Sequence, residues 1–254
     1  INKMYYNPVK LIETDNWLDE CNNLMKSLNI INPLVITSEG NVDRNNLSSI
    51  FDINYIFSDI SPDPSLISCQ RAIDCINQSN YDGIIAIGGG SVMDTAKVIM
   101  LYMGTNISDL NELLNYSNKY KLIPSIFIPT THGTGSEVTM WGTIWDTERK
   151  RKFSISHSNL YPSCAILDAN LTVSLSLKLS IITTLDALSH SFESIWNKNA
   201  NPVSTKYAIN AIVSIINNIN NFKDNPKDIQ LRKKLLVASN RAGLAFSNTK
   251  TAAA

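Results

Sequence analysis

The feature that most constrains this chain is a run of three glycines between an apolar segment and an amphipathic one. Residues 83–87 have the length and apolar character of a buried strand, and they lead directly into Gly88-Gly89-Gly90-Ser91. Residues 92–103 then carry apolar side chains at a spacing of three to four, as on one face of a helix. A strand, a glycine turn and a helix in this order predict one unit of an α/β fold.

The glycine run has two interpretations. Glycines let a backbone approach an anion and adopt positive φ, while free N–H groups at a helix start bind phosphate, and Ser91 adds a hydroxyl. The alternative is a tight strand-to-helix turn without a ligand, because neither GxGxxG nor a Walker pattern is present. Asp94 and Lys97 on the first helical turns favour a phosphate loop, unless they form a solvated i,i+3 pair.

A second polar loop follows another predicted strand, residues 125–128. The loop reads Pro129-Thr130-Thr131-His132-Gly133-Thr134-Gly135-Ser136-Glu137. Taken alone, its hydroxyl side chains could be ordinary turn residues. However, ligands in open α/β sheets bind beyond the carboxyl ends of the strands, so two such loops reinforce each other.

The rest of the chain divides into two styles. Strand candidates at 34–37 and 55–57 and a helix after Ser65 continue the alternation that is typical of a parallel sheet. Residues 139–145 and 151–156 flank a charged turn and predict an antiparallel hairpin, and helices are predicted at 183–196, 203–219 and 228–245. We therefore expect an α/β plus all-α chain, with a Rossmann-like domain at residues 1–170 and a helical domain at 171–254.

Composition excludes some classes of partner. The 254 residues carry 22 basic and 22 acidic side chains, which gives no electrostatic case for nucleic acid or a membrane surface. No apolar stretch approaches the roughly 20 residues that span a bilayer. The four scattered cysteines fit reduced thiols in a cytoplasmic protein. The chain starts at Ile1, and both of its ends look cut.

A carboxylate and an imidazole share one face of the first long helix. Asp186 and His190 lie four residues apart, so they could hold one divalent metal together. An ordinary Asp–His hydrogen bond is the alternative. Two ligands also do not make a tight site, since three or four are normal.

Together these segments resemble the iron-dependent (group III) alcohol dehydrogenase family. The matching strings are residues 88–97 (GGGSVMDTAK), 129–137 (PTTHGTGSE), 166–168 (ILD) and 185–193 (LDALSHSFE). The resemblance covers nearly the whole chain. It implies a Rossmann-like domain, a helical domain and an active site in the cleft between them.

The resemblance also implies site residues for NAD(P)H and a metal. The implied cofactor-binding residues are Gly89, Gly90, Ser91, Asp94, Thr130, Thr131, Thr134, Ser136 and Lys152. Asp186 and His190 would be catalytic, as two of four ligands to Fe²⁺, Zn²⁺ or another divalent ion. The other two ligands would be histidines in a later segment, so we expect a C-terminally truncated, inactive piece of the enzyme.

Two positions depart from the family pattern. His132 stands where a small residue is usual, near the expected nicotinamide, so it either contacts substrate or fills space. Ser38 occupies the position where many NAD-preferring members carry Asp, which would bond the ribose and repel a 2′-phosphate. Ser38 therefore leaves NADPH open, although Glu39 is adjacent.

Within the family, residues 141–146, 193–202 and 247–254 resemble the phosphonoacetaldehyde reductase branch. Lys198 and Lys250 become candidates for a dianionic phosphonate, unless they are simply surface lysines. The expected function is hydride transfer between nicotinamide and a small alcohol or aldehyde, in a homodimer or larger homo-oligomer. The alternatives are a nucleotide-binding module without catalysis and an enzyme like dehydroquinate synthase or glycerol-1-phosphate dehydrogenase.

Overall fold

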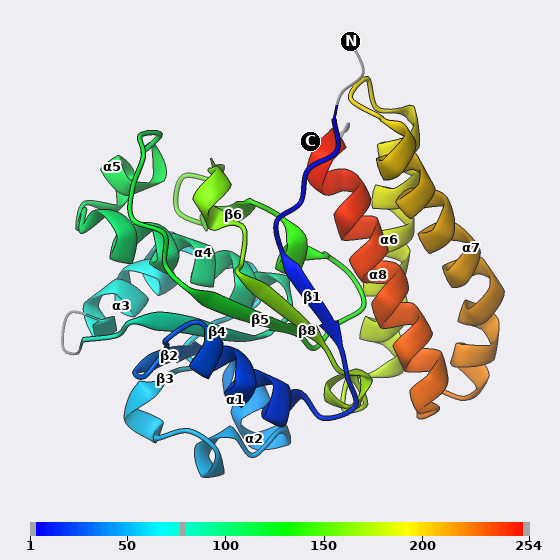
Figure 1. Cartoon of the computed structure of the whole chain (residues 1–254), viewed down its shortest axis with the longest axis horizontal. Coiled ribbons are helices and arrows are strands. Elements are labelled where there is room, and N and C mark those ends of the chain that lie inside the picture. Colours follow the sequence, from blue (N-terminus) through cyan, green and yellow to red (C-terminus); the bar gives the residue numbers. More distant parts are fainter. Residues whose placement is uncertain (1–3, 77–79, 251–254) are drawn as a thin grey trace.

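A computed structural model describes residues 4–76 and 80–250, which form a parallel sheet with helices on both faces and three long helices beside it (Figure 1). All pairings in the six-stranded sheet are parallel, and the strand order is β1-β8-β5-β4-β2-β3. The strands are β1 (Lys10–Glu13), β2 (Pro33–Ile36), β3 (Ile56–Phe57), β4 (Gly83–Gly88), β5 (Ser125–Pro129) and β8 (Cys164–Leu167). The expected fold class is confirmed.

The central strands are apolar on both sides because each side faces a helical layer. In β4, Ile84 and Ala86 pack into one core, while Ile85 and Ile87 pack into the other. The first core is completed by α3 (Leu66–Ile76), α4 (Gly90–Thr105) and α5 (Leu110–Leu114). On the opposite face lie α1 (Trp17–Ser27) and α2 (Glu39–Arg44) (Figure 1).

Two strands, β1 and β8, and three helices, α1, α2 and α5, of the sheet domain were not predicted. β1 is an edge strand with charged residues at both ends and mostly exposed side chains, so it carries no apolar run. β8 has only four residues, and α1 has too polar a sequence to stand out. The strand expected at 55–57 is shorter, because residues 53–55 form a 3-10 turn before β3.

The predicted hairpin is present as β6 (Trp141–Asp146) and β7 (Arg151–Ser156), paired antiparallel. Its turn contains Lys150 with a φ of 52°, in the left-handed region. Ile144 and Ile155 point from the hairpin into the core around α4, so the opposite face of the hairpin is left open.

The helical region comprises α6 (Leu177–Trp196), α7 (Pro202–Asp224) and α8 (Ile229–Thr249), each longer than predicted. Asn201 caps α7 with a capping box and Asp228 caps α8, which explains where these helices begin. The boundary expected at residue 170 falls in the 3-10 turn that follows β8. No described helix is long and apolar enough to cross a membrane.

α8 joins the sheet to the helical region. A Cβ on Gly243 would lie 2.7 Å from the carbonyl oxygen of Gly135, so the helix and the second polar loop touch through their backbones. Nearby, the buried Asn240 amide donates to the Glu137 carboxylate at 2.8 Å. From the N-terminal segment, the Tyr5 hydroxyl donates to the Leu244 carbonyl at 3.1 Å.

Candidate active site between the sheet and the helices

A cavity of about 380 Å³ lies where the glycine loop's helix, the second polar loop, the hairpin and the helical region meet. Its lining residues are Asp94, Thr134, Ser136, Thr139, Trp141, Thr143, Lys152, Ser154, Ser156, His190, Phe246 and Lys250. Hydroxyl groups, two lysines and one histidine converge on this space. Residues far apart in the sequence thus form one polar site with an aromatic wall.

The glycine loop packs against the second polar loop. A Cβ on Gly89 would lie 3.0 Å from Thr131 Cγ2, and one on Gly90 would lie 2.7 Å from Thr134 Cγ2. The glycines are therefore needed for close approach. Gly89 and Gly90 are not required for a positive φ, because among the described glycines only Gly135 has one. Gly89 is the N-cap of α4 and no described side chain caps this helix, which leaves its N–H groups for an anion.

Asp94 links three elements at the floor of the cavity. Its carboxylate accepts the Ser136 hydroxyl at 3.0 Å and the Thr143 amide at 3.0 Å. Burial raises the pKa of Asp94, and the charge of Lys97 opposes that shift. Asp94 and Lys97 do not form a solvated pair on the helix surface, because the Lys97 side chain is fully buried.

The open face of the hairpin forms one wall. Trp141 pairs with Ser156, and Thr143 pairs with Ser154, so these side chains share a face. The ammonium of Lys152 lies 5.8 Å from the ring centre of Trp145, its cross-strand partner.

Asp186 and His190 lie one turn apart on α6. Asp186 Oδ2 is 3.8 Å from His190 Nδ1, which is too far for a hydrogen bond. Nδ1 is buried without a partner among the described residues, and the imidazole lies 4.8 Å from the Phe246 ring. An unpaired nitrogen beside a carboxylate suits two donors to one metal ion. The described residues contain no group of three possible ligands, so they fit half of such a site.

Several expected cofactor residues lie outside the described lining of the cavity. The expected residues in the described lining are Asp94, Thr134, Ser136, Lys152 and His190. The others, outside the described lining, are Ser38, Gly89, Gly90, Ser91, Thr130, Thr131 and Asp186. Ser38 is the N-cap of α2, and the Ser91 hydroxyl accepts the Asp63 amide at 3.2 Å.

His132 fills space and does not face the cavity. It is fully buried, and its ring meets Phe222 of α7 edge-on, with centroids 6.0 Å apart. Neither ring nitrogen has a hydrogen-bond partner among the described residues. Burial, and then the charge of Arg232, lower the pKa of His132 to about 3, so the imidazole is neutral. The expectation of a substrate contact therefore has no support in the structure.

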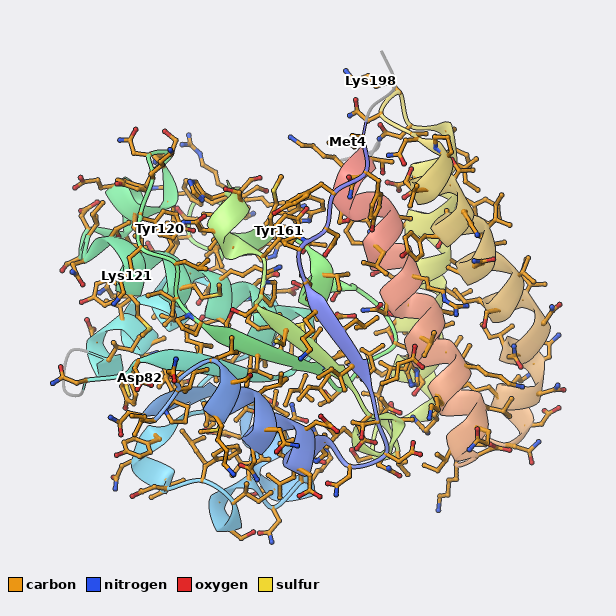
Figure 2. All side chains as sticks on the ribbon, viewed as in Figure 1. Met4, Asp82, Tyr120, Lys121, Tyr161 and Lys198 are labelled. Carbon is orange, nitrogen blue, oxygen red and sulfur yellow. The ribbon has the colours of Figure 1, made fainter. Side chains whose placement is uncertain are left out.

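The two lysines considered for a phosphonate lie in different places. Lys250, just after α8, lines the cavity. Lys198 lies in the turn between α6 and α7, at the outer end of the helical region (Figure 2), and is outside the described lining.

The sequence interpretation missed half of the lining. The missed residues are Thr139, Trp141, Thr143, Ser154, Ser156 and Phe246. A signal for the hairpin residues does exist, because polar and apolar side chains alternate along 152–156 and mark one polar face. Phe246 carries no such signal, since it reaches the cavity only through the packing of α8.

Fold and cavity together define a Rossmann-like α/β protein with an added helical region, whose site lies between the two. Residues 8–169 match the iron-containing alcohol dehydrogenase family, and residues 180–254 match the C-terminal region of the Fe-containing alcohol dehydrogenase family. The chain belongs to the iron-containing alcohol dehydrogenase family.

Two curated relatives with similar sequences support this membership. The NAD-dependent methanol dehydrogenase of Bacillus methanolicus is 37% identical over 194 residues, which are 76% of this chain and 51% of that protein. The probable alcohol dehydrogenase EutG of Escherichia coli (strain K12) is 38% identical over 186 residues, 73% of this chain and 47% of that protein. The chain thus spans about half the length of these relatives.

Among solved structures, the sulfoacetaldehyde reductase of Bifidobacterium kashiwanohense in complex with NAD⁺ superposes with a TM-score of 0.90 at 26% identity. The match covers 99% of this chain and 68% of that one. A 1,3-propanediol oxidoreductase gives a TM-score of 0.88 at 27% identity and similar coverage, 98% and 68%.

Proposed function

We propose that this chain is the cofactor-binding portion of an NAD(P)-dependent, metal-dependent alcohol dehydrogenase or aldehyde reductase. One observation carries the proposal. A single cavity brings Asp94 of the glycine-loop helix, Ser136 of the second loop and Lys152 of the hairpin together with His190 of α6. A cofactor that lies along Asp94, Ser136 and Lys152 would end at His190.

The cofactor proposal rests on the uncapped start of α4 and on the relatives. The free N–H groups at Gly90 and Ser91 suit a pyrophosphate, and Lys152 supplies a positive charge in the cavity that Asp94 of the same helix lines. A methanol dehydrogenase relative is named as NAD-dependent, and the sulfoacetaldehyde reductase was solved with NAD⁺. Ser38 presents no carboxylate toward a ribose, so we propose that NADPH is accepted as well as NADH.

Asp186 and His190 would hold a divalent metal, Fe²⁺ or Zn²⁺, with further ligands from outside the described residues. When bound, such an ion polarises a substrate carbonyl. The chain's own residues do the rest: the two loops bind and orient the nicotinamide nucleotide, and Trp141 and Phe246, whose rings lie 5.8 Å apart, exclude water from one side.

We propose an anionic aldehyde, such as phosphonoacetaldehyde, as the substrate. Lys250 supports this because it lines the same cavity as His190 and would attract a phosphonate. The sulfoacetaldehyde reductase acts on an aldehyde with an analogous anionic group, as its name states. Lys198 has no comparable support, since it lies outside the described lining.

A second candidate function is nucleotide binding without catalysis. It is favoured by the metal donors, because the described residues offer two where ordinary sites have three or four. A homo-oligomeric state and a cytoplasmic location stay predictions. Light scattering on a sizing column and cell fractionation would test them.

Titration of the 254-residue chain separates the two candidates. We expect NADH to bind and quench tryptophan fluorescence, and we expect less than one equivalent of Fe²⁺ or Zn²⁺ to remain after dialysis. A chain that binds no NADH would contradict the proposal. One that reduces aldehydes with a full equivalent of metal would contradict the non-catalytic candidate.

A further inference from the structure

The most deeply buried charge at this site belongs to Lys97, one turn after Asp94 on α4. Its side chain is 0% exposed, and its ammonium bonds to residues that line the cavity. Four oxygen atoms surround the ammonium. They are the Ser136 carbonyl at 2.9 Å, the Ser136 hydroxyl at 2.7 Å, the Thr139 hydroxyl at 2.8 Å and the Trp141 carbonyl at 2.7 Å. An ammonium has three hydrogens and no lone pair, so Lys97 has nothing left to offer a ligand.

The Ser136 hydroxyl lies between Lys97 and Asp94, and its hydrogen has one possible direction. Lys97 can only donate, so Ser136 Oγ accepts from it. An ionised carboxylate can only accept, so the same hydroxyl donates to Asp94 at 3.0 Å. One lone pair of Ser136 then remains, and Ser136 lines the cavity.

We propose that Lys97 is a positioning residue that fixes the Ser136 hydroxyl as a hydrogen-bond acceptor toward the cofactor. This inference rests on the proposed function. The wall at Ser136 then recognises an N–H or O–H group, of the kind that the carboxamide and the ribose of a nicotinamide nucleotide carry. Lys97 acts through Ser136 without touching the cofactor.

The charged surroundings of Lys97 make this arrangement sensitive to pH. Two carboxylates face the ammonium: Asp94 on α4 and Glu137 in the 3-10 turn that ends the second polar loop. Lys152 of β7 acts on Asp94, and the Phe127 ring of β5 lies 6.0 Å from the ammonium. Burial lowers the pKa of Lys97 to about 8, although the charges of Asp94 and Glu137 act to raise it. A neutral amine has a lone pair, so above this pH Ser136 is free to turn its hydrogen elsewhere.

The test is a double-mutant cycle on NADH binding, measured by fluorescence titration at pH 7. We expect Lys97→Met and Ser136→Ala each to weaken binding at least tenfold, and the double variant to bind about as weakly as either one. The matched control is Lys206→Met, a surface lysine of α7 away from the cavity, which should bind like the parent. Parent-like binding by Lys97→Met, or effects that multiply in the double variant, would overturn the inference.

A second measurement needs no variant at Lys97. NADH affinity of the parent should fall as pH rises from 7 to 9, and that of Ser136→Ala should stay nearly constant. Circular dichroism at each pH checks that both proteins stay folded. Constant parent affinity overturns this inference alone, whereas a parent that never binds NADH overturns the proposed function with it.

The titration of Lys97 also changes the stability of the fold, which the circular dichroism control reports. The pKa of Lys97 is about 8 when folded and about 10.5 in an unfolded chain, so the unfolded state binds the extra proton between these values. This group therefore destabilises the fold below pH 8 and stops doing so as pH rises toward 10.5. A loss of NADH affinity between pH 7 and 9 is then not explained by unfolding through Lys97.

Discussion

Lys97 and His132 are both fully buried polar side chains, and they differ in how their polar atoms are satisfied. The ammonium of Lys97 has four oxygen partners, whereas both nitrogens of His132 have none among the described residues. A buried group without a partner costs about 1–3 kcal/mol of stability. His132 is therefore a residue whose replacement can stabilise the protein, while Lys97 is one whose replacement leaves several oxygens unpaired.

We expect His132→Phe to keep the edge-on packing against Phe222 and to raise stability most at acid pH. The pKa of His132 is about 3 when folded and about 6.5 in an unfolded chain, so the unfolded state binds the extra proton between these values. His132 therefore does not lower the free energy of unfolding above pH 6.5, but it lowers this free energy progressively as pH falls from 6.5 toward 3. Urea unfolding from pH 7 to pH 4 would measure it.

The raised pKa values of Asp94 and Glu137 act in the opposite direction, because each folded carboxyl holds its proton more strongly than the unfolded one. The comparison must therefore be between His132→Phe and the parent at each pH. If the free energy of unfolding changed with pH equally in the two proteins, the loss of stability at acid pH would not come from His132.

These residue-scale properties could not be predicted from the sequence. Asp94 and Lys97 were identified by their position after the glycines, yet their spacing equally fits a solvated helix face. Only the packing of the second loop and the hairpin over α4 decides that Lys97 is buried. Likewise, nothing near His132 in the sequence indicates that α7 covers it.

At the scale of elements, the contact between the two polar loops determines the shape of the proposed phosphate site. We expect Gly90→Ala to weaken NADH binding about tenfold or more, because its Cβ would lie 2.7 Å from Thr134 and push the loops apart. Isothermal titration would measure the change. Gly40→Ala is the control, since its Cβ would meet only the end of the flexible Arg44 side chain. Equal affinities in the two variants would contradict the role of the contact.

The elements that pattern alone predicted are those with a strong periodicity or a long apolar run. β4, β5, the hairpin and the three long helices belong to this group. The edge strand β1 was missed because its partly exposed residues need no apolar run, and β8 because four residues hold too little pattern. The cavity wall formed by Trp141, Thr143 and Ser154 depends on the register of the hairpin, which the turn sequence does not fix by itself.

At the scale of the whole molecule, α8 binds the sheet and the helical region into a single unit. We expect Gly243→Ala to lower the free energy of unfolding by about 1–3 kcal/mol, as in other overpacked contacts. Its Cβ would lie 2.7 Å from a backbone oxygen of Gly135 and 2.8 Å from Val138 Cγ2, so a backbone must move. Urea unfolding followed by circular dichroism and by tryptophan fluorescence would measure the change.

The same experiment tests whether the sheet and the long helices unfold together. The parent should show a single transition with both probes, since three tryptophans lie in the sheet region and Trp196 lies on α6. Loss of stability without separation of the two probes supports a shared unit. Unchanged stability in Gly243→Ala would contradict the tight backbone contact.

The position of β8 has a consequence for synthesis of the protein. β8 is the last strand of the sheet in the sequence, yet it lies between β1, the first, and β5. On a translating ribosome, β1 lacks its neighbour in the sheet until residues 164–167 emerge. The N-terminal segment must therefore wait until the residues up to 167 have been made before β1 can join the sheet.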